Sequence, residues 1–172
     1  QPLAAQAEGV GINTVKTLSK LQKIIKKAVI QNNKIHFLPV YRPEQAQRLR
    51  TLLDLNEASF QSMISVQLIK AVIAQRSIKA TEEVVEIEMA VNTTIDMQLE
   101  AMRYAKEGMT EANVAGRIHG LAISAGGNLS FPTILTVNGQ ILHNHYSNTI
   151  LHNGQLVLCD CGAETAMHYA GD

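Results

Sequence analysis

Residues 153–172 read NGQLVLCDCGAETAMHYAGD, and the prediction of the fold starts from this pattern. The Asn-Gly pair at its start is typical of a tight turn. The apolar run that follows predicts a strand over Gln155–Asp160, and residues 168–172 are expected to begin one more strand. If these two strands pair as a hairpin, Asp160 and Asp172 face one interior pocket.

The two aspartates are candidate metal ligands because of where they stand. A carboxylate at the end of a buried strand must be paired, hydrogen-bonded or metal-bound, since burying a bare charge is very costly. Gly162, which follows Asp160 closely, lets the chain bend. Two converging carboxylates suit hard divalent cations. For either Asp alone, capping a turn or pairing with an arginine is the stronger alternative.

Cys159 and Cys161 flank Asp160 and are the only cysteines of the chain. Positions two apart in a strand point the same way, so a bridge between these two would be strained. We expect two reduced, buried thiols and therefore a reducing, cytoplasmic location. A metal clip is the weaker alternative because a second pair of ligands at the usual spacing is absent from the sequence.

A histidine pair lies on the predicted strand Gln140–Tyr146. This strand is expected to form a hairpin with Phe131–Val137 through the Asn138-Gly139 turn. On a strand, His143 and His145 share a face, so both could reach one site as metal ligands, proton donors or hydrogen-bond partners of a substrate. The alternative is one buried histidine beside one surface histidine.

Two helices are predicted before this hairpin. Apolar residues spaced by three or four from Val84 to Met102 mark the first, with Thr81 as its expected N-cap and Gly108 as its stop. Thr110 is expected to cap the second helix, 111–124.

The N-terminal half predicts helices with a single strand. An amphipathic helix is expected over residues 14–31, a strand over 35–38 and a helix starting at Pro43. Residues 65–74 could form a short helix or a strand, and a helix is the preferred interpretation. The twelve residues at the start of the chain are expected to be a poorly fixed lead-in. This order favours part of an α/β domain.

Charge divides the chain near residue 80. Residues 1–80 hold 12 Lys and Arg against 4 Asp and Glu, whereas residues 81–172 hold 3 against 11. This reversal predicts two folding units that meet within residues 76–81. The basic half raises a nucleic-acid-binding module as one alternative. A solvated lysine face is the preferred interpretation, because aromatic residues make up only 4% of the chain and base stacking needs them.

Several classes are excluded by absent patterns. The sequence contains no dinucleotide-binding or phosphate-binding glycine motif, no H-E-x-x-H and no G-x-S-x-G. No signal peptide is recognisable, and no apolar run approaches the roughly 20 residues that a membrane-spanning helix needs. We therefore expect neither a nucleic acid nor a membrane as a partner.

An ordered set of motifs resembles the family of aminopeptidase P and prolidase. The matching segments are Ile78-Lys79, Glu82–Ile87, Phe131–Ile134, Ile141–His143, Asn153–Leu158, Asp160–Glu164 and Tyr169–Asp172. The resemblance implies that residues 1–77 are the back part of a creatinase/prolidase-like N-terminal α/β domain. It also implies that residues 78–172 are the first half of an α+β pita-bread catalytic domain, so that both domains are incomplete.

The same resemblance implies roles for the candidate residues. Asp160 and Asp172 correspond to the two metal-binding aspartates, one of which bridges two ions. His143 corresponds to the active-site histidine, with His145 as an alternative. The segment between the aspartates is one residue longer than in the family. The family's remaining ligands, a histidine and two glutamates, lie downstream of the second aspartate, where this sequence has ended.

The implied activity is hydrolysis of the N-terminal peptide bond of Xaa-Pro peptides by two divalent ions, manganese, cobalt or zinc. The implied partners are a small peptide with proline at its second position and a second copy of the chain in a homodimer. With two ligands of five, the chain by itself is expected to be inactive and to bind metal poorly. The alternative is a non-catalytic pita-bread module that binds peptides or proteins.

Overall fold

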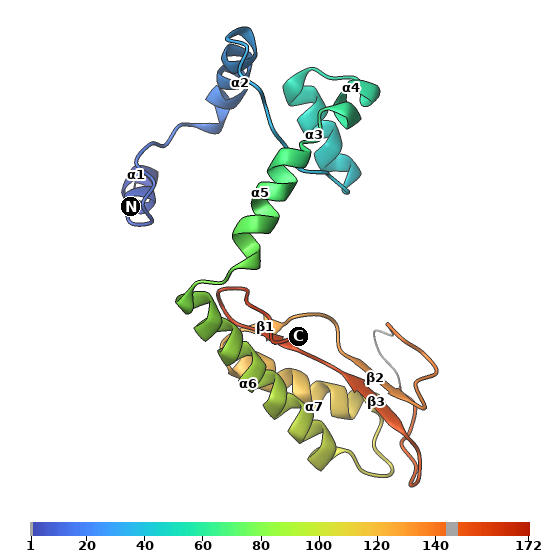
Figure 1. Cartoon of the computed structure of the whole chain (residues 1–172). Helices are drawn as coiled ribbons and strands as arrows, with labels where there is room; N and C mark the ends of the chain where they lie inside the picture. The colour runs from blue at the N-terminus through green and yellow to red at the C-terminus, as the bar shows by residue number, and fades with distance from the viewer. Residues whose placement is uncertain (1, 144–147) are drawn as a thin grey trace. The chain divides into compact units, whose positions relative to one another are not determined.

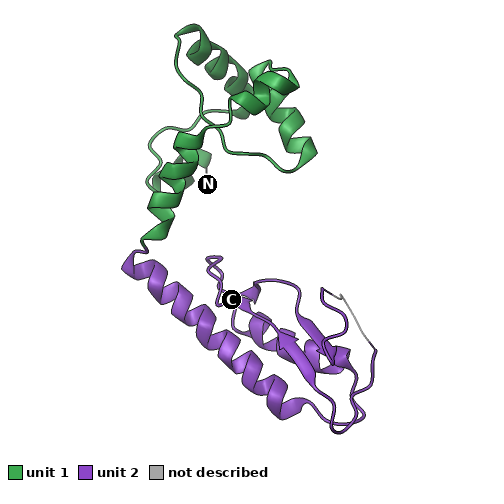
Figure 2. Ribbon diagram, turned by 45° about the vertical axis from the view of Figure 1, so that its right-hand side comes forward, with its two compact units in different colours: residues 1–78 green, residues 79–172 purple. Residues whose placement is uncertain are grey.

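The computed structural model describes residues 2–143 and 148–172, and the chain divides into two compact units, 1–78 and 79–172 (Figure 2). The elements of the first unit are α1 (Leu3–Glu8), a 3₁₀ turn (Leu18–Lys20), α2 (Leu21–Ile30), α3 (Pro43–Leu53), α4 (Glu57–Ser62) and α5 (Val66–Ser77).

Two predictions for the first unit are confirmed. Pro43 occupies the first turn of α3, where its missing N–H costs nothing. The predicted helix over 65–74 is α5, and its N-cap Ser65 accepts a hydrogen bond from the backbone N–H of Leu68 at 3.1 Å. Local chemistry therefore sets the start of both helices.

Three expectations for the first unit are wrong in detail. The helix expected from residue 14 becomes regular only at Leu21, since Thr17 has extended backbone and a 3₁₀ turn intervenes. The lead-in contains the short helix α1. The strand expected over 35–38 is reduced to one parallel bridge between Phe37 and Ile64. A strand needs a partner for its hydrogen bonds, and the described part of this unit pairs it at one point only.

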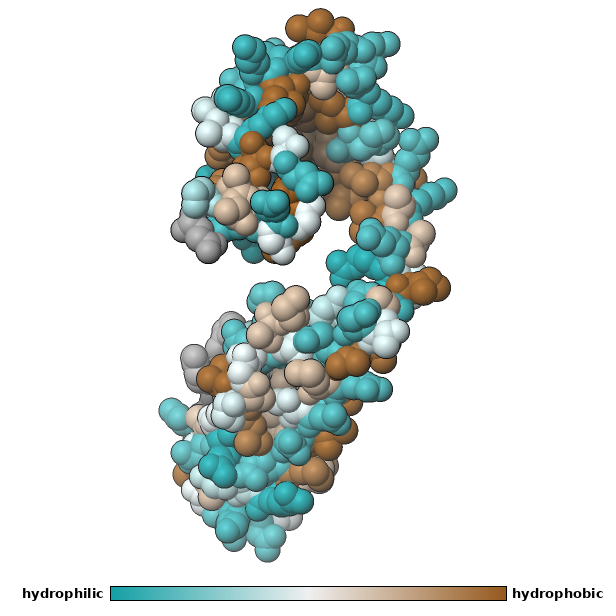
Figure 3. All heavy atoms as spheres, turned by 90° about the vertical axis from the view of Figure 1, so that its left-hand side faces the viewer, coloured by the Kyte–Doolittle hydropathy of each residue, from teal (hydrophilic) through white to brown (hydrophobic). Residues whose placement is uncertain are grey.

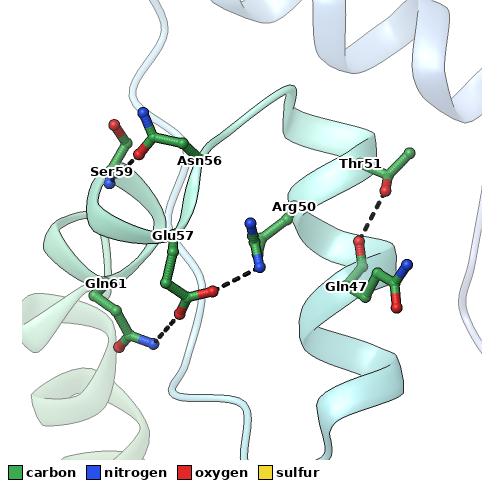
Figure 4. A network of polar contacts seen from close by, with 7 residues as sticks. All are labelled: Gln47, Arg50, Thr51, Asn56, Glu57, Ser59 and Gln61. Carbon is green, nitrogen blue, oxygen red and sulfur yellow. Dashed lines mark hydrogen bonds and ion pairs between the residues drawn. The ribbon is translucent and has the colours of Figure 1, made fainter.

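The first unit packs around one aromatic pair. The rings of Phe37 and Phe60 stack with centroids 5.0 Å apart, and Phe60 is buried. A polar network links α3 to α4, in which Arg50 donates to Glu57 at 2.6 Å and Gln61 donates to the same carboxylate at 3.0 Å (Figure 4). Because Glu57 is largely exposed, this network contributes little to stability.

The second unit combines two helices with short strands (Figure 1). The elements are α6 (Thr81–Tyr104), α7 (Glu111–Ser124), β1 (Asn128–Leu129), β2 (Ile134–Val137), β3 (Val157–Asp160) and β4 (Ala163–Glu164). Strand β2 pairs with β3 and β1 pairs with β4, both antiparallel. Within the stretch 157–164, the first four residues therefore pair with β2 and the last two pair with β1.

Both predicted helices of this unit form. Helix α7 spans the predicted residues, and Thr110 caps it as expected: its hydroxyl accepts from the N–H of Asn113 at 3.1 Å, while the Asn113 side chain accepts from the N–H of Thr110 at 2.9 Å. Helix α6 begins at Thr81, so its N-cap is Ala80 rather than Thr81. The carboxylate of Glu83, three residues into the helix, accepts from the Ala80 N–H at 2.7 Å and so satisfies the backbone donor of the N-cap residue.

The main core of the second unit lies between the helices and one face of the strands. Its buried members are Met97, Ala101, Val114, Ile118, Ala122, Leu135, Val137, Leu151, Cys161 and Ala163. Three of these come from α7, and the strands contribute alternate residues, as a pleated strand requires. The helices thus cover one face of the strands.

The expected hairpin over 131–146 does not form in its described part. Asn138 and Gly139 do make a turn with positive φ, and Gln140 donates to the carbonyl of Val137 at 3.5 Å. Yet β2 pairs with β3, four residue pairs deep, and not with the residues that follow the turn. Pairing with β3 places Val157 and Cys159 against the helices, where apolar burial favours them.

No helix within residues 2–143 and 148–172 is long and apolar enough to cross a membrane. Helix α6 nevertheless carries exposed apolar side chains, among them Val85, Met89 and Met102. Hydrophobic atoms are interspersed with hydrophilic ones on the molecular face shown in Figure 3.

Candidate metal centre

The candidate ligands lie on the face of the strands that α6 and α7 leave open. Along 157–163, the side chains of alternate residues beginning with Val157 and Cys159 join the core against the helices. The residues between them belong to the opposite face. Asp160, paired with Ile134, and Gly162 therefore lie on the open face. The strand pleat thus separates the carboxylate from the core.

A tight hairpin brings Asp172 to this face. Thr165 donates to the carbonyl of Tyr169 at 2.9 Å, and Gly171 donates to the carbonyl of Ala163 at 2.9 Å. Continuing this register sets Asp172 beside Gly162. A Cβ atom placed on Gly162 would indeed lie 3.1 Å from the Cβ of Asp172. Glycine at this position therefore leaves the room that the Asp172 side chain occupies.

Helix α6 fixes the hairpin from the other side. Ala163 donates its N–H to the hydroxyl of Thr94 at 3.0 Å, and the hydroxyl of Tyr169 donates to Glu83 at 2.8 Å. Gly171 approaches the backbone of α6 so closely that an added Cβ would lie 2.5 Å from the carbonyl of Ala90. The position of Asp172 is thus set by close packing one residue before it.

The pKa of the Cys161 thiol responds to both carboxylates. The sulfur atoms of Cys159 and Cys161 are 3.9 Å apart, and Cys161 is buried. Its hydrogen bond with Cys159, its burial and the negative charges of Asp160 and Asp172 hold the pKa of the Cys161 thiol well above its usual range. Both thiols are free, as predicted from their spacing.

The expected burial of the aspartates is wrong. Asp160 and Asp172 are both exposed. The apolar run predicts a buried strand, but Leu158 and Asp160 on the open face are exposed while Cys159 on the helix side is partly buried. The carboxylates therefore keep contact with water and avoid the cost of burial.

The histidine prediction rested on a strand that is absent from the described part. His143 lies in a bend with a left-handed φ of 57° and is exposed. The argument that residues two apart share a face therefore does not apply to it. His145 lies outside the described residues.

The structure places two further polar side chains that the sequence did not single out. Ser130 donates its N–H to the carbonyl of Gly162 at 3.1 Å, and its buried hydroxyl lies against that glycine. Glu111 is buried at the start of α7. An acidic residue in the first turn of a helix is usually exposed, so the sequence did not indicate that Glu111 is buried.

The donor set fits part of a site for hard divalent cations. Two carboxylates on one open face are the ligand type that such ions prefer. Within residues 2–143 and 148–172, however, no three His, Cys, Asp or Glu side chains are grouped so that they could hold a metal ion. Asp160 and Asp172 would accordingly supply two ligands of a larger set.

Two helices cover one face of two short antiparallel strand pairs, and solved structures of the pita-bread metallopeptidase class share this fold. A variant of aminopeptidase P from Escherichia coli is 25% identical with a TM-score of 0.76, covering 100% of this chain and 40% of its own. The prolidase from Pyrococcus furiosus is 20% identical with a TM-score of 0.68, covering 88% of this chain and 45% of its own. The X-Pro aminopeptidase from Thermotoga maritima is 19% identical with a TM-score of 0.61, covering 88% and 42%.

The sequence itself gives the same result. Residues 79–172, more than half of the chain, match the model of Metallopeptidase family M24, and the chain belongs to that family. No curated protein sequence matches the chain. The chain spans less than half the length of each structure named above. The expected fold class and the expected family are therefore confirmed.

Proposed function

We propose that this chain is part of an aminopeptidase that hydrolyses the N-terminal peptide bond of Xaa-Pro peptides. One observation carries the proposal: Asp172 is seated against Gly162 on the open face of the strands, where Asp160 also lies. The family and the likeness to an aminopeptidase P, a prolidase and an X-Pro aminopeptidase support it.

The proposed roles follow from the chemistry of each side chain. Asp160 and Asp172 hold divalent cations, predicted to be two ions of manganese, cobalt or zinc in the complete protein. Such ions, when bound, lower the pKa of a shared water and stabilise negative charge on the scissile carbonyl. His143, which is exposed on the connection after β2, hydrogen-bonds the substrate and can move a proton. His145 stays an alternative for this role.

Further parts of the proposal concern the rest of the molecule. Residues 1–77 would be the back part of an N-terminal domain, and 78–172 the first half of the catalytic domain. The free thiols Cys159 and Cys161 favour a reducing, cytoplasmic location. A homodimer stays a prediction.

An activity assay of the complete protein that contains this chain tests the substrate. With manganese added, we expect release of the N-terminal residue from Xaa-Pro peptides and none from matched Xaa-Ala peptides. Replacement Asp160→Ala or Asp172→Ala should abolish release, whereas Asp96→Ala, an exposed carboxylate on α6, should not. Equal cleavage of both peptides would refute the Xaa-Pro preference, and activity without metal would refute the mechanism.

Calorimetric titration of the 172-residue chain with manganese tests the ligand set. Because two carboxylates alone bind such ions feebly, we expect dissociation constants well above micromolar and no peptidase activity. Submicromolar binding of two ions per chain that Asp160→Ala removes would show that the missing ligands come from another source, such as a second copy.

A further inference from the structure

Glu111 is a buried carboxylate that the proposed mechanism does not use. The residue is 3% exposed, and its Oε1 accepts a hydrogen bond from the backbone N–H of Val137 at 2.6 Å. Its Oε2 is buried and has no hydrogen-bond partner among the described residues. Burying a polar group without a hydrogen bond costs free energy, and Oε2 of Glu111 is buried in this way.

The backbone of the same residue binds a second segment. The N–H of Glu111 donates to the carbonyl of Thr149 at 3.0 Å. Next to it, Leu151 donates to the carbonyl of Met109 at 2.8 Å, and Gly108 donates to the carbonyl of Leu151 at 2.9 Å. Residues 108–111 and 149–151 thus form a short antiparallel contact.

Through these bonds, Glu111 links the end of β2 to the segment 149–151. Its side chain holds Val137, the last residue of β2, and its backbone holds Thr149. The connection between these two residues carries His143. One residue therefore bonds to both ends of the connection.

We propose that Glu111 is a positioning residue that acts through His143. This inference rests on the proposed function, in which His143 contacts the substrate. His143 is itself exposed, so core packing does not fix its place. His143 follows β2 on this connection, and the hydrogen bond from Val137 to Glu111 fixes the point at which the connection leaves β2.

The alternative is that Glu111 only stabilises the helix that it begins. A carboxylate in the first turn interacts favourably with the helix dipole, and losing it would weaken α7 as a whole. The two roles predict different changes when Glu111 is replaced. A positioning role predicts faster amide exchange in the connection alone. A helix-stabilising role predicts faster exchange at the core residues Ile118 and Ala122 of α7 as well.

Amide hydrogen exchange of the 172-residue chain separates these roles. In Glu111→Ala we expect exchange at Val137 and residues 138–143 to rise about tenfold, the change expected from losing one buried hydrogen bond. Exchange at Ile118 and Ala122 should stay unchanged. Glu111→Gln keeps an acceptor oxygen and should restore most of the protection at Val137. Glu107→Ala, an exposed glutamate just before α7, is the matched control and should change nothing.

Two results would overturn the inference. Unchanged exchange at Val137 in Glu111→Ala would show that the bond is not formed in solution. Equal acceleration at Val137, Ile118 and Ala122 would show that Glu111 stabilises the helix only.

Kinetics of the complete protein test the link to His143. We expect Glu111→Ala to lower kcat on Xaa-Pro peptides on the order of tenfold to a hundredfold, as misplaced catalytic groups do. Combining it with His143→Ala should lower kcat no further than His143→Ala alone, and Glu111→Gln should recover most of the loss. Fully additive effects would overturn the positioning role. If the complete protein has no peptidase activity, the proposed function fails, while the exchange experiment still decides whether Glu111 holds the connection.

Discussion

The two units of this chain differ in what holds their elements in place. The first unit buries Phe37, Phe60 and few other described residues, and its helices α4 and α5 begin at the side-chain caps Asn56 and Ser65. The second unit buries a contiguous cluster drawn from α6, α7 and the strands. Local chemistry dominates in the first unit, and long-range packing dominates in the second.

This difference explains where the candidate site lies. A site needs side chains held at fixed separations, and close packing holds them better than local caps do. Asp160 and Asp172 are placed by strands and a hairpin that rest on the helices of the second unit. The following predictions test this contrast, ordered by the size of the expected effect.

The largest effect is expected from the core of the second unit. Ile118, 0% exposed, is replaced by Ala, which should lower the free energy of unfolding of residues 79–172 by about 2 to 5 kcal/mol, through lost burial and the cavity left behind. Because the chain has no Trp, urea-dependent amide exchange is the suitable measurement. Ile123→Ala on the exposed side of α7 is the control and should cost under about 0.5 kcal/mol. Equal losses at both positions would contradict a core centred on Ile118.

The next effect tests the close approach of the hairpin to α6. Gly171→Ala adds a Cβ that would lie 2.5 Å from the Ala90 carbonyl, so the backbone must shift. We expect a loss of about 1 to 3 kcal/mol from overpacking, together with a changed position of Asp172. Gly116→Ala is the matched control, because nothing lies within 4 Å of its added Cβ and alanine favours the helix interior by roughly 0.5 to 1 kcal/mol. If Gly171→Ala were also stabilising, the close approach would be wrong.

A smaller effect compares one cap in each unit. Thr110→Ala and Asn56→Ala each remove one side-chain acceptor at a helix start, which costs about 1 kcal/mol. In the second unit, the loss of the cap should lower the protection of all core amides against exchange by a similar factor. In the first unit it should raise exchange in α4 alone, as limited proteolysis near residues 56–62 can also show. Thr110→Ser keeps the hydroxyl and should behave like the native chain.

The smallest effect concerns pH. Burial lowers the pKa of His119 below its ordinary value of 6.5, and its Nε2 is buried without a partner among the described residues. The unfolded chain therefore takes up the proton first as the pH falls. The stability of the second unit should be full above about pH 6.5 and should decrease as the pH falls below it. His119→Gln should remove this slope, and His152→Gln on the surface should not.

Much of the local structure could be read from the sequence because its signals are local. Thr110 and the apolar spacing after it predict α7 to the residue, and Pro43 marks the start of α3. The Asn153-Gly154 turn and the apolar run after it predict β3. The order of the motifs around Asp160 and Asp172 gave the family, which the match to residues 79–172 confirms.

Pairing, burial and side-chain partners were decided by the tertiary structure. The turn at Asn138 forms as its sequence predicts, yet β2 pairs with β3. This pairing packs the β3 side chains Val157 and Cys159 against the core that the helices cover. Whether Asp160 is buried depends on which face of β3 the helices cover. That Glu111 meets both Val137 and Thr149 depends on three segments far apart in the chain. Local sequence fixes backbone preference, whereas such contacts depend on which surfaces pack most closely once the chain is folded.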